Sequence, residues 1–164
     1  MKLLHNIGPR LNSNYNTPEE VAACEEPLSF DGIYLNVYTH RQLLAGKTGM
    51  LFVMGDYVGG DNSFDHGMPP ENYCTWEQIH EIASVSGFEI GWHTWSHPDL
   101  TTVSDEQLRA EVTPPFPLKT FAYPYGRFDG RVIEAVMAAG FREAWSVDQG
   151  DDSLFQRRRS YLNW

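Results

Sequence analysis

The chain has 164 residues, of which 41% are hydrophobic and 21% are charged, and its formal net charge is −10. This length suits one domain with a sizeable core, so we expect a single domain over residues 1–164, and the composition argues against a disordered chain. Because an acidic surface repels polyanions, we expect no nucleic-acid partner.

The amino-terminal sequence MKLLHNIGPR lacks the apolar stretch of an export signal, and no segment approaches the roughly 18 apolar residues of a membrane span. We therefore expect a cytoplasmic protein with no membrane span, unless a leader has been removed. The two cysteines, Cys24 and Cys74, form no C-x-x-C motif. Two free thiols are expected, rather than a thiolate metal site or a disulfide. The sequence leaves the oligomeric state open.

Short apolar runs along the chain predict β-strands. Several of these runs are too apolar for a sheet with one solvated face, which is typical of parallel strands. The runs are residues 2–5, 27–30, 50–54, 88–91, 118–122 and 143–147.

Helix-capping residues lie between these runs. In residues 75–87, Thr75 is an N-cap, Gln78 lies three positions later, and Gly87 is expected to end the helix. The other segments with caps are residues 17–20, 104–112 and 129–140, where Thr17, Ser104 and Asp129 are the caps and Gly140 ends the last helix.

Strands that alternate with helices favour a mostly parallel α/β sheet, either open and doubly wound or closed into a barrel. In both architectures, ligands gather at the carboxyl ends of the strands. The polar residues that follow the predicted strands are His5, Asp31, His93, His97, residues 123–127 and Asp148. Chemistry is expected among them.

His93 and His97 are the most informative of these residues. Their H-x-x-x-H spacing suits two neutral imidazole ligands of zinc or a similar ion. The spacing alone more often belongs to packing or surface histidines, but the position directly after a strand favours the functional interpretation.

The sequence of residues 75–112, TWEQIHEIASVSGFEIGWHTWSHPDLTTVSDEQLRAEV, resembles the NodB-type polysaccharide deacetylases, carbohydrate esterase family four, in its helix and its H-[ST]-x-x-H motif. Other landmarks follow the family order. They are LSFDG at 28–32, similar to the T/S-F-D-D-G motif, GMLFVMGDYVG at 49–59, FAYPYGRFD at 121–129 and GFREAWSVD at 140–148. The resemblance covers roughly residues 26–164.

This resemblance implies a distorted or incomplete (β/α) barrel of mostly parallel strands. It also implies an enzyme, a hydrolase that removes N-acetyl groups from a cell-surface glycan or its precursor with the help of a divalent metal. Zinc is the expected metal, with nickel or cobalt as alternatives, and an acetylated saccharide is the expected partner.

The resemblance also implies roles for individual residues. His93 and His97 would hold the metal, Asp31 would be the general base, and the backbone N–H of Tyr125 would stabilise the oxyanion. Two tryptophans, Trp95 and Trp145, either line the sugar site or belong to the core.

The chain departs from the family at its carboxylates. Gly32 stands where the family has a second aspartate as the third metal ligand. Alternatively one residue is deleted, and Asp31 is the surviving ligand while the general base is missing. His5 is a further candidate for the third ligand, and a site without a third ligand is also compatible with the sequence.

Two further departures concern the third motif and the carboxyl terminus. Ala122 replaces the family arginine, so Arg159 or Arg127 is a candidate to orient Asp31. We expect no counterpart of the carboxyl-terminal leucine and histidine that supply the general acid in the family, because the sequence ends in RRRSYLNW. A polar loop at residues 59–72, which includes Asp65 and His66, is either a lid or a plain connection.

Three functions are therefore open. The first is the metal-dependent N-deacetylase. The second is a metal-independent amide hydrolase, similar to the allantoinase-like branch of the family, and it is motivated by the missing ligand. The third is a catalytically inactive glycan-binding protein on the same fold, because a fold can be kept after its chemistry is lost.

Overall fold

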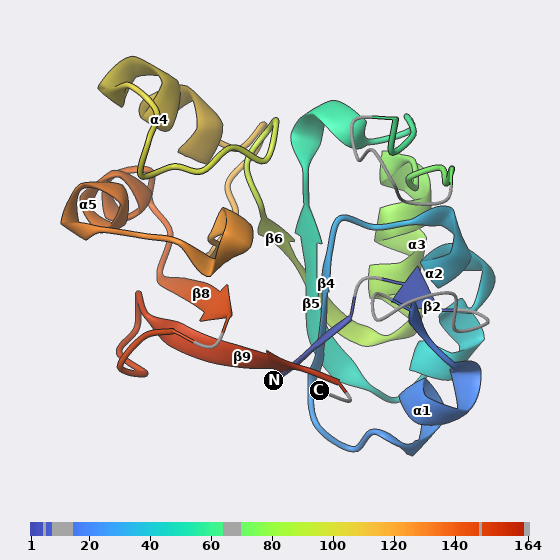
Figure 1. The fold of residues 1–164 in the computed structure, drawn as a ribbon. Coiled ribbons are helices and arrows are strands. Elements are labelled where there is room, and N and C mark those ends of the chain that lie inside the picture. Colours follow the sequence, from blue (N-terminus) through green and yellow to red (C-terminus); the bar gives the residue numbers. More distant parts are fainter. Residues whose placement is uncertain (5, 8–14, 64–69, 148, 163–164) are drawn as a thin grey trace.

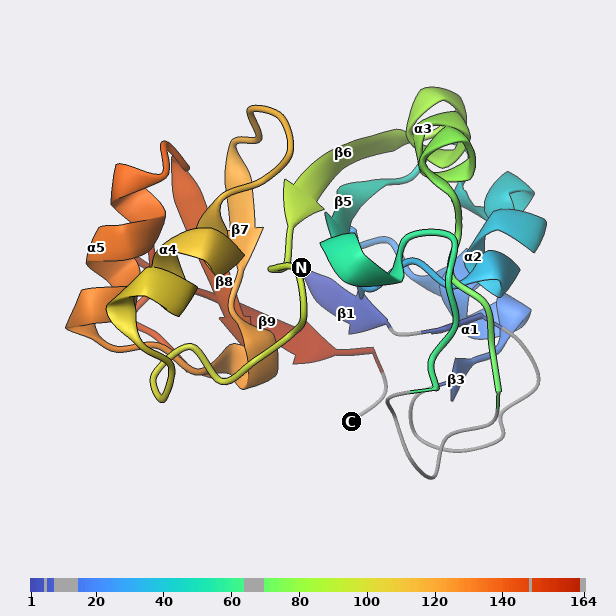
Figure 2. The ribbon, with the colours of Figure 1, turned by 90° about the horizontal axis from the view of Figure 1, so that it is seen from above.

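The computed structural model describes residues 1–4, 6–7, 15–63, 70–147 and 149–162. A closed barrel of parallel strands forms its centre, with the strand order β1-β4-β5-β6-β7-β8-β9 (Figures 1 and 2). These strands are β1 (Lys2–Leu4), β4 (Leu28–Asp31), β5 (Thr48–Val53), β6 (Gly87–Trp92), β7 (Thr120–Ala122), β8 (Glu143–Val147) and β9 (Arg157–Tyr161). A separate two-stranded sheet pairs β2 (Asn6–Ile7) with β3 (Tyr15–Asn16).

Helices surround the barrel. In both ribbon views, α1, α2 and α3 lie on one side of it, and α4 and α5 lie on the other (Figures 1 and 2). The α-helices are α1 (Pro18–Ala23), α2 (Leu35–Thr39), α3 (Trp76–Val85), α4 (Asp105–Val112) and α5 (Gly130–Ala138). Short 3-10 helices are η1 (Arg41–Leu44), η2 (Gly55–Tyr57) and η3 (Pro124–Gly126).

The predicted barrel is confirmed, and it is closed rather than incomplete or open. Closure depends on β9, which pairs with β8 on one side and with β1 on the other. This strand was not predicted, because its sequence RRRSY is charged. The short helix α2 was also missed, since its first residue follows Tyr34, which makes no side-chain cap.

The predicted helix starts are confirmed. Thr17 and Thr75 each form a capping box, and Ser104 and Asp129 accept hydrogen bonds from backbone N–H groups of α4 and α5. Gly140, with a φ of +94°, follows α5 as expected.

Gly87 follows α3 as predicted, and it also begins β6. Helix α3 ends at Val85, with Ser86 as its C-cap. The Gly87 N–H donates to the Lys47 carbonyl at 2.8 Å, and a Cβ at this position would lie 2.9 Å from the same oxygen. The glycine therefore permits a close approach of two backbones.

Alternation along the strands separates an outer core from the barrel interior. Side chains that face the helices include Phe30, Leu51, Val53, Trp92 and Phe121. A second apolar cluster of Met50, Phe52 and Ala122, with Met1 and Trp145 packed against it, lies between the strands. Polar side chains complete the interior at the carboxyl ends of the strands and form the site described next.

Among the described residues, no helix has the length and apolar character needed to cross a membrane.

Candidate active site

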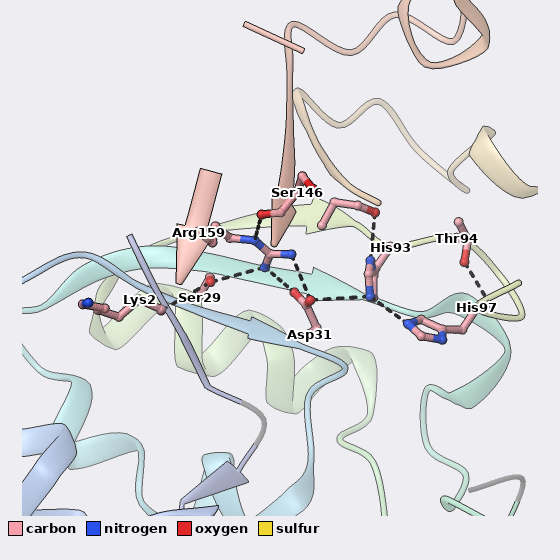
Figure 3. A network of polar contacts seen from close by, with 9 residues as sticks. Lys2, Ser29, Asp31, His93, Thr94, His97, Ser146 and Arg159 are labelled. Carbon is pink, nitrogen blue, oxygen red and sulfur yellow. Dashed lines mark hydrogen bonds and ion pairs between the residues drawn. The ribbon is translucent and has the colours of Figure 1, made fainter. Parts of the chain in front are cut away.

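His93 directly follows β6 and is held by its backbone and by its ring. Its N–H donates to the Val53 carbonyl at 2.9 Å, and its Nδ1 lies 2.8 Å from the Ala122 carbonyl (Figure 3). Because a carbonyl oxygen only accepts, Nδ1 carries the hydrogen, and Nε2 of the neutral ring presents a lone pair. Burial lowers the pKa of His93, although the nearby Asp31 opposes this effect, so the neutral form is favoured.

His97 brings a second ring nitrogen to the same point. Its Nε2 lies 3.1 Å from Nε2 of His93 (Figure 3). Two imidazole nitrogens at the usual Zn–N distance of a tetrahedral site would be about 3.3 Å apart. The pair therefore has a spacing that suits one metal ion. The His97 N–H donates to Oγ1 of Thr94 at 3.0 Å, which closes the turn between the two histidines.

Asp31 ends β4 beside this pair. Arg159 donates two hydrogen bonds to its carboxylate, from Nη1 to Oδ1 at 2.5 Å and from Nη2 to Oδ2 at 2.9 Å (Figure 3). Oδ2 also lies 3.6 Å from Nε2 of His93. The guanidinium of Arg159 is fully buried and contacts the hydroxyl of Ser29 and the carbonyl of Ser146 as well. It therefore fixes the direction of the Asp31 carboxylate.

Of the two arginines considered for Asp31, the structure places Arg159 against it. Arg127 instead donates to Asp99 at 2.6 Å, outside this network. Ala122, at the position of the family arginine, has a side chain buried beside Met50 and Phe52, while its carbonyl contacts His93.

No side chain projects from Gly32, and the space around it is filled. Its φ is +71°, and a Cβ there would lie 2.6 Å from Cε of Met54 and 2.9 Å from Cε1 of Tyr73. Within the part of the chain that the structure describes, no group of three or more His, Cys, Asp or Glu side chains is arranged to hold a metal. The described residues thus offer two histidines, with Asp31 next to them.

Some sequence candidates lie outside the described residues: His5, Asp65, His66 and Asp148.

The turn that contains Tyr125 borders the histidine pair. Tyr125 lies in η3 with a φ of +57°, and the centroid of its ring is 4.6 Å from that of His97. The carbonyl of Gly126 accepts a hydrogen bond from the hydroxyl of Ser146 at 2.7 Å, which anchors the turn to β8. The structure thus brings Asp31, His93, His97 and Tyr125 to one end of the barrel.

The two tryptophans are partly exposed and pack against the apolar clusters. Trp95 contacts the ring of Trp92, with centroids 5.0 Å apart, and donates from Nε1 to the Thr113 carbonyl at 2.9 Å. A Cβ at Gly55 would lie 2.3 Å from the Trp95 ring, so the glycine makes room for it. Trp145 packs against the apolar cluster inside the barrel.

Sequence reasoning missed Glu111. It is buried near the end of α4, together with Leu108 and Val112. Its carboxylate accepts hydrogen bonds from the loop between His93 and His97. A signal was available, because residues 108, 111 and 112 share one helix face, and a glutamate on an apolar face requires a partner.

Residues 45–144, more than half of the chain, match the family model described as polysaccharide deacetylase. The chain belongs to this family. The resemblance noted in the motifs is therefore confirmed, and the chain carries its histidine motif in the loop that follows β6.

Curated relatives match parts of this family member. It is 43% identical over 61 residues to chitin deacetylase 1 of Cryptococcus neoformans var. grubii, a match that covers 29% of the chain and 12% of the relative. It is 33% identical over 94 residues to chitin deacetylase 1 of Saccharomyces cerevisiae, covering 51% of the chain and 31% of the relative. The chain thus spans less than a third of either relative.

Solved structures share the fold over nearly the whole chain. A deacetylase of Streptococcus pyogenes, PplD in complex with acetate, gives a TM-score of 0.71 at 14% identity and covers 99% of this chain and 93% of its own. IcaB from Ammonifex degensii gives a TM-score of 0.69 at 19% identity, covering 88% of this chain and 81% of its own. At these identities the likeness concerns the fold alone.

Proposed function

We propose that this chain is a metal-dependent hydrolase that removes N-acetyl groups from a cell-surface glycan or its precursor. The observation that carries the proposal is the convergence of three atoms at the carboxyl ends of β4 and β6. Nε2 of His97 lies 3.1 Å from Nε2 of His93, and Oδ2 of Asp31 lies 3.6 Å from the same His93 nitrogen. Family membership and the chitin deacetylase relatives support an acetylated saccharide as the substrate.

His93 and His97 would hold the metal, which we propose to be zinc, with nickel or cobalt as alternatives. When bound, the metal would polarise the amide carbonyl and make a water molecule more acidic. His93 is suited to this role because its Nδ1–H is fixed on the Ala122 carbonyl, which orients the ring and leaves Nε2 available.

Asp31 would act as the general base and accept the proton of the attacking water. Its hydrogen bonds to Arg159 stabilise the ionised carboxylate and aim it towards the histidines. The backbone N–H of Tyr125 would donate to the oxyanion that forms on the amide carbonyl. Hydrolysis of the amide then yields acetate and the free amine of the sugar.

The role of Asp31 has an alternative, in which its carboxylate is a metal ligand. The double hydrogen bond from Arg159 engages both oxygens and favours the role of base. An Asp31→Asn variant separates the two roles. If Asp31 is the base, the variant keeps its metal and loses acetate release; if Asp31 is a ligand, the variant loses both.

The glycine at position 32 favours two other functions. A site with two histidines and no second aspartate is expected to bind metal more weakly than a three-ligand site. A metal-independent amide hydrolase or a catalytically inactive glycan-binding protein would be compatible with such a site. Activity that survives a chelator and the His93→Ala change would support the metal-independent hydrolase. Saccharide binding without turnover would support the inactive glycan-binding protein.

The deciding experiment measures acetate released from N-acetylated chitin oligosaccharides. Wild type with zinc, nickel or cobalt is compared with wild type in chelator and with the His93→Ala/His97→Ala variant. We expect acetate only from wild type with metal, and we expect the activity to return when metal is added back after chelation. No acetate from any acetylated amino-sugar under all metals would contradict the proposal.

A further inference from the structure

Glu111 is a buried carboxylate whose two oxygens both face the loop between the histidines. The residue is 6% exposed. Its Oε2 accepts from the backbone N–H groups of Trp95 at 2.8 Å and Ser96 at 3.0 Å, and its Oε1 accepts from the hydroxyl of Ser96 at 2.6 Å. The three donors belong to two consecutive residues of the motif His93-Thr94-Trp95-Ser96-His97.

This loop has a backbone that requires support from outside. Thr94 and His97 have φ angles of +69° and +59°. Such angles are uncommon for residues other than glycine, and a β-branched threonine there is an outlier. Residues in these conformations persist when the surrounding structure determines them. The two strained residues flank Trp95 and Ser96, and the N–H groups of Trp95 and Ser96 donate hydrogen bonds to Glu111.

The end of α4 anchors the same region through further bonds. Nε1 of Trp92 donates to the Glu111 carbonyl at 2.9 Å, and Nε1 of Trp95 donates to the Thr113 carbonyl at 2.9 Å. On the opposite side, the carbonyls of Thr94 and Trp95 accept from the N–H groups of residues 55 and 56. Two carbonyls of the loop are thus bound by η2, and two of its N–H groups are bound by Glu111.

The hydrogen bonds from the loop suit a carboxylate. Oε2 accepts from two backbone N–H groups, and Oε1 accepts from the Ser96 hydroxyl. A glutamine of the same shape would keep one oxygen for the two N–H groups but would turn its NH2 group towards the Ser96 hydroxyl, so the change removes the negative charge and reverses one hydrogen bond. The negative charge also strengthens each hydrogen bond in a buried environment.

We infer that Glu111 is a positioning residue that fixes His97 relative to His93 and so sets the affinity of the pair for metal. His93 is held independently of this loop, by the carbonyls of Val53 and Ala122. The position of His97, in contrast, depends on the loop that Glu111 binds. Glu111 acts through the loop, by its hydrogen bonds to Trp95 and Ser96. The inference rests on the proposed function, because it concerns the same metal pair.

The test compares Glu111→Gln with Glu106→Gln, a change of the same kind at an exposed glutamate in the first turn of the same helix. Zinc affinity is measured by competition with a chromophoric chelator, and urea unfolding is measured in parallel. We expect Glu111→Gln to bind zinc about tenfold more weakly or worse, and Glu106→Gln to match wild type. A residue with only a structural role would lower the unfolding midpoint and leave the zinc affinity of the folded protein unchanged.

The rate of amide hydrogen exchange in the peptide that spans residues 93–98 is a second measurement, and it needs no metal. We expect faster exchange in Glu111→Gln and wild-type exchange in Glu106→Gln. If Glu111→Gln fails to fold, Ser96→Ala takes its place, because the side chain of this exposed residue supplies one of the three donors. A smaller change in the same direction is then expected.

Wild-type zinc affinity in Glu111→Gln, or in Ser96→Ala where that variant is used, would overturn the inference. If wild type itself binds no zinc, the metal part of the proposed function fails, and exchange at residues 93–98 alone decides the role of Glu111. Faster exchange would then support the positioning role, and unchanged exchange would overturn it.

Discussion

Arg159 and Asp31 form a buried ion pair that joins the two ends of the sequence. The Arg159 side chain is 0% exposed and the Asp31 side chain 9% exposed. Burying two charges is costly, and the cost is offset only when both are well hydrogen-bonded. Here the guanidinium contacts the carboxylate twice and also Ser29 and Ser146. Removing one partner would leave the other as an uncompensated buried charge.

Replacing Arg159 by methionine is therefore expected to lower the free energy of unfolding by about 3–5 kcal/mol. Arg158→Met is the matched control, because Arg158 lies next to it in β9, is 54% exposed and pairs with the exposed Asp152. Such a surface pair contributes about 0–1 kcal/mol. Urea unfolding of the two variants tests this difference. Equal losses of stability would contradict the account of the buried pair.

Gly32 illustrates a position where conformation and space both exclude a side chain. Gly32→Ala is expected to destabilise the protein more than Gly46→Ala. Both residues have a positive φ, of +71° and +77°, so both changes carry a backbone cost of about 1–2 kcal/mol. A Cβ at Gly46 meets nothing within 4 Å, whereas one at Gly32 meets Met54 and Tyr73. Overpacking adds about 1–3 kcal/mol at Gly32.

Comparing the unfolding midpoints of the two variants in urea separates strain from overlap. Similar midpoints would mean that the side chains of Met54 and Tyr73 can move aside at little cost in free energy. The space for a carboxylate at position 32 would then be available in this chain.

The two cysteines differ in reactivity because only one is accessible. Cys74 is fully buried, its thiol contacts the Tyr34 carbonyl, and burial raises its pKa to about 12. Cys24 is half-buried, and both thiols are free. We expect iodoacetamide at pH 8 to modify Cys24 in the folded protein and Cys74 only after unfolding, since the thiolate is the reactive species. Peptide mass spectrometry would identify the labelled cysteine. Rapid labelling of Cys74 in the native protein would contradict the burial of its thiol.

At the scale of elements, helix α3 shows how local sequence signals fix a start. Its first turn has reciprocal bonds, in which Oγ1 of Thr75 accepts from the N–H of Gln78 and the Gln78 side chain accepts from the N–H of Thr75. We expect Thr75→Ala to reduce the free energy of unfolding by about 1 kcal/mol. Ser84→Ala, at an exposed site of the same helix, should change it by about 0.5 kcal/mol or less. Thermal or urea unfolding provides the comparison.

Elements with local signals could be predicted, and elements defined by tertiary contacts could not. The apolar strands β5 and β6 and the capped helices α3, α4 and α5 were all indicated by the sequence. Strand β9 was not, because its arginines indicate a solvated segment until Asp31, 128 positions away, is seen beside Arg159. Gly87 was predicted only as the end of helix α3, because its close contact with the backbone of Lys47 is a tertiary contact.

The same distinction applies to the site. The position of residues at strand ends predicted that Asp31, His93, His97 and Tyr125 would gather at one end of the barrel, and the structure places them there. The contribution of Glu111 depends on hydrogen bonds between α4 and a loop 15 or 16 positions earlier. A sequence pattern carries no direct information about such a contact.

At the scale of the whole molecule, barrel closure and the site depend on each other. Strand β9 closes the barrel between β8 and β1, and the same strand supplies Arg159 to Asp31 at the end of β4. The histidines come from the opposite side of the interior, after β6. The closed barrel is therefore what holds the carboxylate and the imidazoles at a fixed separation.

We propose that His93 and His97 form a metal site although Gly32 provides no ligand. The decisive measurement is elemental analysis of the purified protein, prepared without chelators or affinity histidines and supplied with zinc, nickel or cobalt. We expect about one metal ion per chain in wild type and none in His93→Ala/His97→Ala. Wild type that retains no metal, or a double variant that retains as much as wild type, would contradict it.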